Sequence, residues 1–440
     1  MRDESDLRAG GVAENIRRLA HLDLAGAGQV YVAGRYAYVG HIPRKDGLGT
    51  TILDVADPGR PKVVSTIFLD DPDSHSHKVR VVGDVMIVNH EENNKGIGRK
   101  ADEMHAASAH LGEVLGRPPS DAELAERLGL AEADINVLRR AETAPYDRGG
   151  FKIYDVSRPA EPRLLHYQRT GGKGVHRFDM DQRYAYISTE MDGYRGNILV
   201  IYDISNPERI GEVSRWWMPG QHVAGGETPH WEGTAHRLHH ALRFGDRLWA
   251  GVWHGGTRII DIADISAPRT IGAYNYHPPF PAPTHTVMPM PLPINNRQIM
   301  LTIDEEDSYY TAAEAARRKG QPHAGLSVFD ATDPGAIAPL AIFGVGELDS
   351  PYSRVAHARF GAHQFHERID GTLVHCAWFG GGLRIVDIAD PTCPREVGAF
   401  IPEPPAGQPA PQSNDVFVDE RGLIHMVDRN VGYDILEYLG

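Results

Sequence analysis

Cysteine is almost absent from this chain: Cys376 and Cys393 are the only two among 440 residues. Two cysteines allow neither a disulfide framework nor a cysteine-rich metal site. Neither lies near a convincing base in the sequence, so thiol catalysis has no support. The chemistry is therefore expected to come from other side chains.

Long apolar runs are also lacking, since none approaches the ~20 residues needed to cross a bilayer. The charged N-terminus leads into no apolar segment, which predicts no secretory signal. Positive charge is scarce, with 45 Lys and Arg against 59 Asp and Glu and a net charge of -14. That balance disfavours nucleic-acid and membrane partners and predicts a soluble, cytoplasmic protein.

Several common motifs are missing as well. No helical pattern recurs between the strand patterns, which disfavours a parallel α/β sheet. There is no Gly-x-Ser-x-Gly nucleophile elbow, and Gly380–Gly382 lacks the strand-to-helix context of a phosphate loop. The chain is instead rich in histidine (23) and glycine (47), which suit metal ligation or proton transfer and tight turns.

A short phrase recurs along the chain: a β-branched run ends in Asp, and a proline turn follows. An Asp at the end of a strand can accept a hydrogen bond from the backbone two residues on, and proline fixes the next turn. The phrase ends at Asp54, Asp155, Asp203, Asp261, Asp330 and Asp387, with a degenerate copy at Asp434–Glu437. Seven four-strand units at roughly 40-residue spacing predict a β-propeller.

The predicted fold is all-β: a seven-bladed β-propeller in which residues 1–440 form one domain. The inner strands are expected to begin near Gln29, His77, His176, His240, His285, His363 and Asn414. The last unit lacks an outer strand, and 16–22 has the length and pattern to supply it. This N-terminal strand would close the ring and remove its free edges.

Two insertions interrupt the repeats, at 93–147 in the second blade and 305–322 in the fifth. Ser120 and Glu123 form a capping box that predicts a helix, and 312–319 reads as a short helix ended by Gly320. Residues 115–130 resemble the helix-turn-helix-like part of bacterial sigma factors, which leaves DNA association as an alternative to a plain helical hairpin. Nine acids against four arginines in 101–142 disfavour DNA. Both insertions are expected to stand over the axial site as lids.

Five histidines recur at the start of the inner strands: His77, His176, His240, His285 and His363. Inner strands line the axis of a propeller, so imidazoles at one depth would converge on a transition metal. Gly28 and Asn414 occupy the same register in the first and seventh units. His240 is preferred to its neighbour His239 because it keeps Leu242 and Phe244 in phase, and His75 lies two residues before His77.

The ends of the second strands are expected to surround this ring. They place Glu190, His254 and Asp304 as candidate catalytic residues. Carboxylates there would accept the N–H of ligand histidines or act as general acids or bases. The alternative is that these acids are simply solvated at the starts of loops.

At the Asp-ended phrases, above all Leu383–Pro391, the chain resembles the LVIVD-repeat propellers, a likeness that implies the fold rather than a function. It is also similar, more faintly, to the selenium-binding proteins, which act as methanethiol oxidases and carry metal-binding histidines. That similarity rests on 187–190, 253–255 and the His-x-His of 75–77. The cysteine usage of that family is missing here. The carotenoid-cleaving oxygenases resemble the predicted fold in architecture alone: they are seven-bladed propellers with four axial histidines on iron.

The leading hypothesis is a metal-dependent enzyme that acts on a small organic substrate at the axial site. Oxidation or oxygenation with Fe or Cu comes first, while Zn or Mn is possible at such a site. A Lewis-acid lyase or hydrolase is an alternative, and so is a binding or scaffold propeller without catalysis. The sequence leaves the substrate, the metal and the oligomeric state open.

Overall fold

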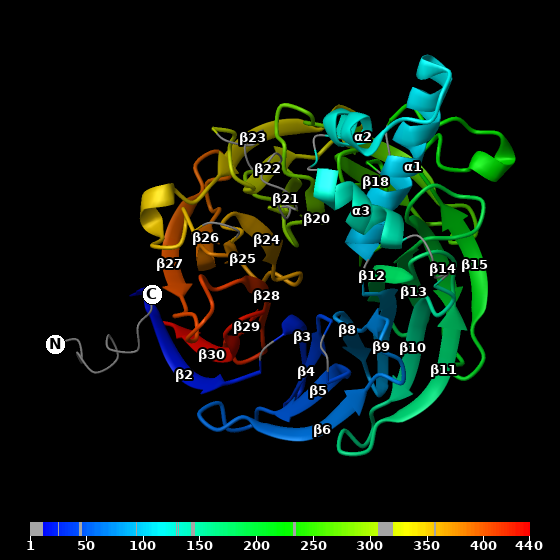
Figure 1. The fold of residues 1–440 in the computed structure, drawn as a ribbon. Helices are drawn as coiled ribbons and strands as arrows, with labels where there is room; N and C mark the ends of the chain where they lie inside the picture. The colour runs from blue at the N-terminus through cyan, green and yellow to red at the C-terminus, as the bar shows by residue number, and fades with distance from the viewer. Residues whose placement is uncertain are drawn as a thin grey trace.

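The chain folds into seven antiparallel sheets arranged around a central axis, as the sequence predicts (Figure 1). This computed structural model describes residues 12–24, 26–43, 46–93, 95–128, 130, 132–141, 146–231, 235–306, 320–355 and 358–440. In Figure 1, β3, β8, β12, β20, β24 and β28 lie innermost, and β6, β11, β15, β23, β27 and β2 lie at the rim.

The first four blades each run from the axis outwards in chain order. Their strands are β3 (Ala27–Ala33), β4 (Tyr36–His41), β5 (Leu48–Asp54) and β6 (Lys62–Phe68); the inner pair β7 (Ser74–His75) and β8 (Val79–Val82), then β9 (Val85–Glu92), β10 (Gly150–Asp155) and β11 (Arg163–Arg169); β12 (Val175–Met180), β13 (Tyr184–Thr189), β14 (Ile198–Asp203) and β15 (Gly211–Trp216); and β16 (His240–Phe244), β17 (Arg247–Gly251), β18 (Thr257–Asp261) and β19 (Arg269–Tyr274).

The last three blades follow the same order, and the N-terminal strands complete two of them. Their strands are β20 (Thr284–Pro289), β21 (Ile299–Asp304), β22 (Leu326–Asp330) and β23 (Ala338–Phe343); β24 (Ala362–Phe365), β25 (Leu373–Trp378), β26 (Gly382–Asp387) and β27 (Arg395–Ile401), with β1 (Val12–Glu14) at the edge; and β28 (Ser413–Val418), β29 (Ile424–Asp428), β30 (Gly432–Tyr438) and β2 (Ile16–Leu22).

The expected closing strand is confirmed, because β2 pairs antiparallel with β30. His21 adds a side-chain link, with its Nδ1 2.9 Å from Oδ1 of the buried Asp434. β1 adds a strand that the sequence reading missed, pairing Val12 with Ile401 at the outer edge of the sixth blade. The first and last segments of the chain therefore meet in the same two blades.

The Asp-ended phrases behave as their chemistry predicts. In six blades the terminal Asp of the third strand accepts a hydrogen bond from the backbone N–H two residues later, at 2.9–3.0 Å; the pairs are Asp54–Ala56, Asp155–Ser157, Asp203–Ser205, Asp261–Ala263, Asp330–Thr332 and Asp387–Ala389. Apolar side chains from neighbouring blades fill the walls between the sheets, and a cluster of Ile87, Phe151, Phe178 and Ile187 is one example.

The first insertion forms the helices α1 (Lys95–Leu115), α2 (Asp121–Leu128) and α3 (Glu132–Ala141). The capping box is present, since Ser120 Oγ accepts from Glu123 N and Glu123 Oε2 accepts from Ser120 N. These helices pack on a small core of their own around Met104, Leu124 and Ile135. The helix expected at 312–319 lies outside the described residues, and the role of both insertions as lids stays a prediction.

Three short 3-10 turns complete the regular structure of the described residues: η2 (Val223–Gly225), η3 (Pro334–Ala336) and η4 (Glu347–Asp349). No helix in the described part of the chain is long and apolar enough to span a membrane.

Candidate metal centre on the propeller axis

Six imidazoles follow one another around the axis at the start of the inner strands. Consecutive ring centroids lie 4.0–5.4 Å apart in the order His75, His77, His176, His239, His285 and His363. All of them are buried except His176, which is partly exposed. The predicted convergence of histidines is therefore present, with two members that differ from the predicted set.

A β-bulge places these residues. The pairing between inner and second strands skips one residue in five blades, and the skipped residue is Gly28, His176, His285, His363 or Asn414. A bulge residue has no partner in the ladder, and it changes which side of the strand the following residues face. Two consecutive residues can therefore face the axis, the bulge residue and the one after it.

In the fourth blade His239 joins the ring in place of the expected His240, and metal binding by His240 stays a prediction. His240 pairs with Gly251 in the ladder, which is the position after the bulge, whereas His239 takes the bulge position. Nε2 of His239 lies 2.8 Å from Nε2 of His176. His240 lies one layer deeper, where its Nδ1 accepts a hydrogen bond from Arg177. Counting strict alternation along the strand hid the bulge and selected the neighbour.

Four histidines of the ring have an acceptor at Nδ1. His176 Nδ1 lies 3.0 Å from Glu91 Oε2, and His239 Nδ1 lies 2.7 Å from the carbonyl of His285. His363 Nδ1 bonds to the carbonyl of Asn414. The Nδ1 of His285 meets Thr286 Oγ1, whose own hydroxyl donates to Gln364 and is therefore an acceptor here. These partners hold the proton on Nδ1 and leave Nε2 as a lone-pair donor, the arrangement found in metal-binding histidines.

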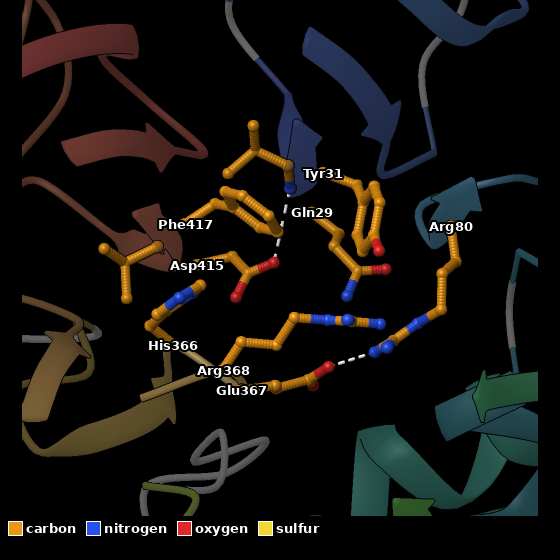
Figure 2. Close-up of a pocket in the computed structure, with 10 residues that line it drawn as sticks. Gln29, Tyr31, Arg80, His366, Glu367, Arg368, Asp415 and Phe417 are labelled. Atoms are coloured by element: carbon orange, nitrogen blue, oxygen red, sulfur yellow. Dashed lines mark hydrogen bonds and ion pairs between the residues drawn. The ribbon is translucent and has the colours of Figure 1, made fainter. Parts of the chain in front are cut away.

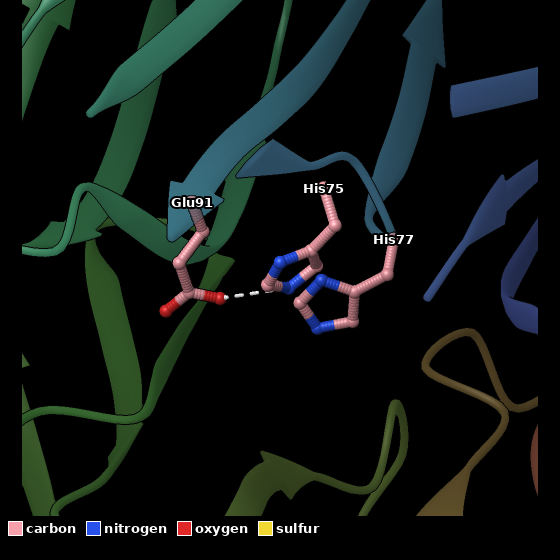
Figure 3. Close-up of side chains that lie close together, drawn as sticks. All are labelled: His75, His77 and Glu91. Atoms are coloured by element: carbon pink, nitrogen blue, oxygen red, sulfur yellow. Dashed lines mark ion pairs between the residues drawn. The ribbon is translucent and has the colours of Figure 1, made fainter. Parts of the chain in front are cut away.

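His77 is arranged differently. The amide of Asn89 donates to the carbonyl of Val175 and accepts from Lys78 N, which fixes its orientation, and its Nδ2 is 3.3 Å from His77 Nδ1. Nδ1 of His77 is thus an acceptor, and the proton of the neutral ring lies on Nε2. His77 therefore differs from the four histidines whose Nδ1 meets an acceptor, and its predicted role as a metal ligand stays a prediction. Figure 3 shows the rings of His77 and His75 side by side, with His75 reaching Glu91 at 3.4 Å.

Two carboxylates adjoin the ring from the ends of second strands. Glu91, at the end of β9, bridges His75 and His176. Glu305, next to the end of β21, lies 4.0 Å from His285 Nε2 and 3.8 Å from His363 Nε2, and Arg359 holds it at 3.2 Å. Ligand atoms of His239, His285 and Glu305 all lie within 4.8 Å of one another. A carboxylate is thus available as a ligand or as a base on the side of His285.

Burial keeps three of the ring histidines neutral. It is the largest effect that holds the pKa of His239, His285 and His363 well below its ordinary value. Neighbouring cations and imidazoles act in the same direction, among them His176 on His239 and Lys78 on His363. A neutral imidazole is the form that binds a metal, so the protein environment favours the ligand state.

The three residues expected from the second-strand ends have partners outside the ring. Glu190 Oε2 accepts from the backbone N–H of Lys173 and so holds the turn before β12. Nε2 of His254 lies 3.3 Å from the carbonyl of Pro281. The buried Asp304 accepts from the hydroxyl of Tyr276, and burial raises its pKa well above the usual range. Their catalytic role stays a prediction, and the adjacent Glu305 faces the ring instead.

A second polar layer lies directly below the histidines. It is made of Lys78 and of residues that follow the bulges, and all of them are buried: Gln29, Lys78, Arg177, His240, Thr286, Gln364 and Asp415. Glu367 organises part of it, accepting from Arg177 Nη2 and from Gln364 Nε2 at 2.7 Å each, and it also pairs with Arg80. Burial alone would raise the pKa of Glu367, but Arg80, His240 and Arg177 outweigh it and hold the pKa below the ordinary value.

The axis opens on the far side of this layer into a small pocket (Figure 2). Its lining includes Arg80, His366, Arg368 and Phe417. Asp415 points into it while its Oδ2 accepts from the backbone of Val30 at 3.3 Å. The ring, the charged layer and this pocket therefore follow one another along the axis.

Comparison with known families agrees with this architecture. The LVIVD repeat matches residues 26–67, 182–216 and 369–401, which cover the first blade and the outer three strands of the third and sixth. The chain carries LVIVD repeats. Each matched stretch contains the Asp-ended third strand of its blade. The match therefore identifies strands that form the blades and not the axial histidines.

Solved structures similar to this LVIVD-repeat chain share its fold. A putative 6-phosphogluconolactonase from Bacteroides uniformis is 10% identical with a TM-score of 0.51, over 89% of this chain and 88% of that one. A periplasmic gluconolactonase from Pseudomonas aeruginosa is also 10% identical with a TM-score of 0.51, over 90% of this chain and 93% of that one. No curated protein sequence matches the chain significantly.

Proposed function

We propose that the protein is a metal-dependent enzyme whose ion is bound by His176, His239, His285 and His363 on the propeller axis. The small organic substrate would reach this ion from the face on which the inner strands begin. Oxidation or oxygenation is the first choice of reaction, with iron or copper as the metal.

One observation carries the proposal: the Nε2 atoms of His176 and His239 face each other at 2.8 Å. Both rings have their Nδ1 protons directed at acceptors, so two lone pairs meet at this distance. Two nitrogens on one metal, each at about 2.1 Å and at right angles, lie about 3.0 Å apart. A shared cation turns a repulsive contact into a favourable one.

The donor set narrows the choice of metal. Imidazole nitrogens with a nearby carboxylate suit iron, copper, zinc or manganese, whereas the cysteines take no part. Cys376 is buried, and Cys393 is exposed and outside the ring. An imidazole-bound iron or copper supplies one-electron redox chemistry when it is present.

The protein supplies the proton chemistry. Glu305 is 3.8 Å from His363 Nε2 and 4.0 Å from His285 Nε2, so its carboxylate lies beside the position that we assign to the metal. Arg359 binds Glu305 and stacks on Phe379, with its guanidinium 3.6 Å from the ring centroid. We assign Glu305 the role of accepting or returning a proton of the bound substrate.

A second candidate is hydrolysis, because a carboxylate beside a Lewis-acidic ion also suits the activation of water. Opening of a lactone is its most concrete form, since two solved propellers of this shape are named gluconolactonases. Their low identity supports the fold alone, so the preference between the two reactions rests on which metal the protein holds.

The matched pair His239→Gln and His240→Gln tests the proposal. The two residues are adjacent, but only His239 belongs to the proposed ligand set. Elemental analysis of protein purified without an affinity tag should give close to one equivalent of a transition metal in the wild type. We expect His239→Gln to lose the metal and His240→Gln to keep it.

Equal metal contents in the two variants would contradict the ligand assignment. A wild type that holds no transition metal, and takes none up when iron, copper, zinc or manganese is supplied, would favour a binding or scaffold propeller. If the protein does hold a metal, electron paramagnetic resonance distinguishes a redox metal from zinc, and so oxidation from hydrolysis.

A further inference from the structure

A second group of potential metal ligands lies next to the four histidines of the proposed metal site. One ring nitrogen each of His75 and His77 and one carboxylate oxygen of Glu91 lie within 4.8 Å of one another. Figure 3 shows both imidazoles beside the carboxylate. None of the three residues belongs to the ligand set proposed above.

Local strand geometry brings these three side chains together. His75 and His77 are two residues apart in an extended segment, which puts both side chains on one side of it, with their ring centroids 4.6 Å apart. His75 is paired with Glu91 in the antiparallel ladder of β7 and β9, so these two side chains leave the sheet next to each other. All three are buried, and Glu91 is completely so.

The distance between His75 and Glu91 suits a shared ion. Two donor atoms at about 2.1 Å from one metal lie about 3.0 Å apart at right angles and about 3.4 Å apart in a tetrahedron. His75 Nε2 lies 3.4 Å from Glu91 Oε2. The two atoms can therefore bind one tetrahedral ion with little movement of either side chain.

His77 provides the third lone pair. Its Nδ1 faces the Nδ2 of Asn89 at 3.3 Å, which is at the long end of the range for a hydrogen bond. The lone pair on Nδ1 is therefore only weakly engaged. Neutral imidazole binds metals through either ring nitrogen, so His77 can give this lone pair to an ion.

The same combination of ligands occurs twice on the axis. His239, His285 and Glu305 also place one ligand atom each within 4.8 Å of one another, and they belong to the centre proposed above. In both groups the imidazoles come from the starts of inner strands and the carboxylate comes from the end of a second strand. Two histidines and one carboxylate bind zinc in hydrolases and iron in non-haem oxygenases.

The two groups meet at His176 without sharing a ligand atom. Nε2 of His176 faces His239 at 2.8 Å, whereas its Nδ1 faces Glu91 Oε2 at 3.0 Å. Ions in the two groups therefore lie toward opposite ends of this imidazole. A carboxylate has about four acceptor positions, so Glu91 can accept from His176 and bind an ion at the same time.

We infer that the axis has a second metal site, in which His75, His77 and Glu91 bind a divalent ion such as zinc. This goes beyond the proposed function, which requires one ion only. Three protein ligands leave a fourth position for water or substrate. Because this site has one ligand fewer than the first, and Asn89 competes for one of its lone pairs, we expect it to fill only when the ion is supplied.

A third group of residues has the same spacing but a different charge. Ligand atoms of Asp70, Asp71 and His90 also lie within 4.8 Å of one another. Lys152 Nζ lies 3.1 Å from Asp70, and Arg148 lies 3.5 Å from Asp71, so positive charges of the protein already adjoin these carboxylates. We expect no ion there.

The matched pair His75→Gln and His90→Gln tests the inference. Native mass spectrometry of the holoprotein, purified without an affinity tag, counts the ions before and after Zn²⁺ is added. We expect the wild type and His90→Gln to take up one additional zinc ion per chain. In calorimetric titration His75→Gln should bind this zinc at least about tenfold more weakly, because even the loss of an outer partner of a ligand typically costs that much.

His75→Gln should keep the resident ion and the circular dichroism spectrum of the wild type, which shows that the variant is folded. The inference is overturned if the wild type takes up no second ion, or if His90→Gln loses it, which would place the ion in the third group. It is also overturned if His75→Gln binds the added zinc as tightly as the wild type, which would mean an adventitious ion only. The resident ion and His239→Gln test the proposed function separately, so either idea can fail without the other.

Discussion

Neighbouring residues on this axis have different roles. His239 faces the proposed metal while His240 accepts from Arg177, and Glu305 faces the ring while Asp304 bonds to Tyr276. The sequence pattern identified the right blades and the right strand ends for these pairs. It selected His240 instead of His239, because the bulge changes which side of the strand each residue faces. Nothing in the sequence marks the bulge.

Glu91 and Glu92 provide a test at the residue scale. Glu91 fixes the Nδ1 proton of His176, whereas Glu92 pairs with Lys173 at 2.9 Å away from the ring. We expect Glu91→Gln to weaken metal binding by about 10- to 100-fold, as loss of such a partner typically does. Competition with a chromogenic chelator measures this affinity.

Glu92→Gln should leave the affinity within a few-fold of the wild type. If both variants bind the metal as the wild type does, Glu91 does not orient His176 as a ligand.

The inner strand is the element that sequence reasoning described least well. The outer framework was predictable, because the Asp-ended third strands, the closing strand β2 and the capping box of α2 each depend on local chemistry. The axial strands depend on contacts between blades that no short window contains. Asn89, for example, reaches from β9 to Lys78 and to Val175 of the next blade.

Gly40 of β4 shows how tightly the elements fit near the ring. A Cβ at this position would lie 2.6 Å from the carbonyl carbon of His77 and 3.0 Å from the backbone nitrogen of Lys78. Backbone atoms cannot move aside cheaply, so Gly40→Ala should lower the free energy of unfolding by about 1–3 kcal/mol. Urea denaturation measures this change.

Gly211→Ala is the control for Gly40→Ala, since a Cβ there meets nothing within 4 Å. A change within about 0.5 kcal/mol is expected for it. A Gly40→Ala protein as stable as the wild type would show that the inner strand of the second blade can shift, and that the positions of His77 and Lys78 are less fixed than described.

On the scale of the whole molecule, the ring of blades depends on one junction between the ends of the chain. β2 pairs with β30 from Ile16 to Leu22. His21 and Asp434 join the two strands by their side chains. The hydrogen bond that His21 donates to Asp434 raises the pKa of His21, while partial burial opposes it. The closure is therefore sensitive to pH.

The sign of this dependence follows from the raised pKa. The folded state binds the His21 proton more tightly than the unfolded chain, whose histidines titrate near about 6.5. The stabilisation is fully present below that value and is lost as the pH rises through the higher pKa of the folded state. Melting temperatures of the wild type and His21→Asn should therefore differ at acidic pH and converge as the pH rises.

His166→Asn, which changes a histidine on β11 of another blade, should not remove the same pH-dependent part of the stability. If the difference between the wild type and His21→Asn is constant across the pH range, the contact with Asp434 does not carry the proton linkage.

The repeated bulge also gives this architecture room for chemical diversification. Each bulged blade offers two adjoining positions to the central channel, and both precede the apolar stretch that packs between blades. Exchanging a side chain at either position alters the lining of the channel. The apolar contacts between the blades stay as they are. A propeller of this kind can therefore acquire a new specificity through a few substitutions at its centre, at little expense to its framework.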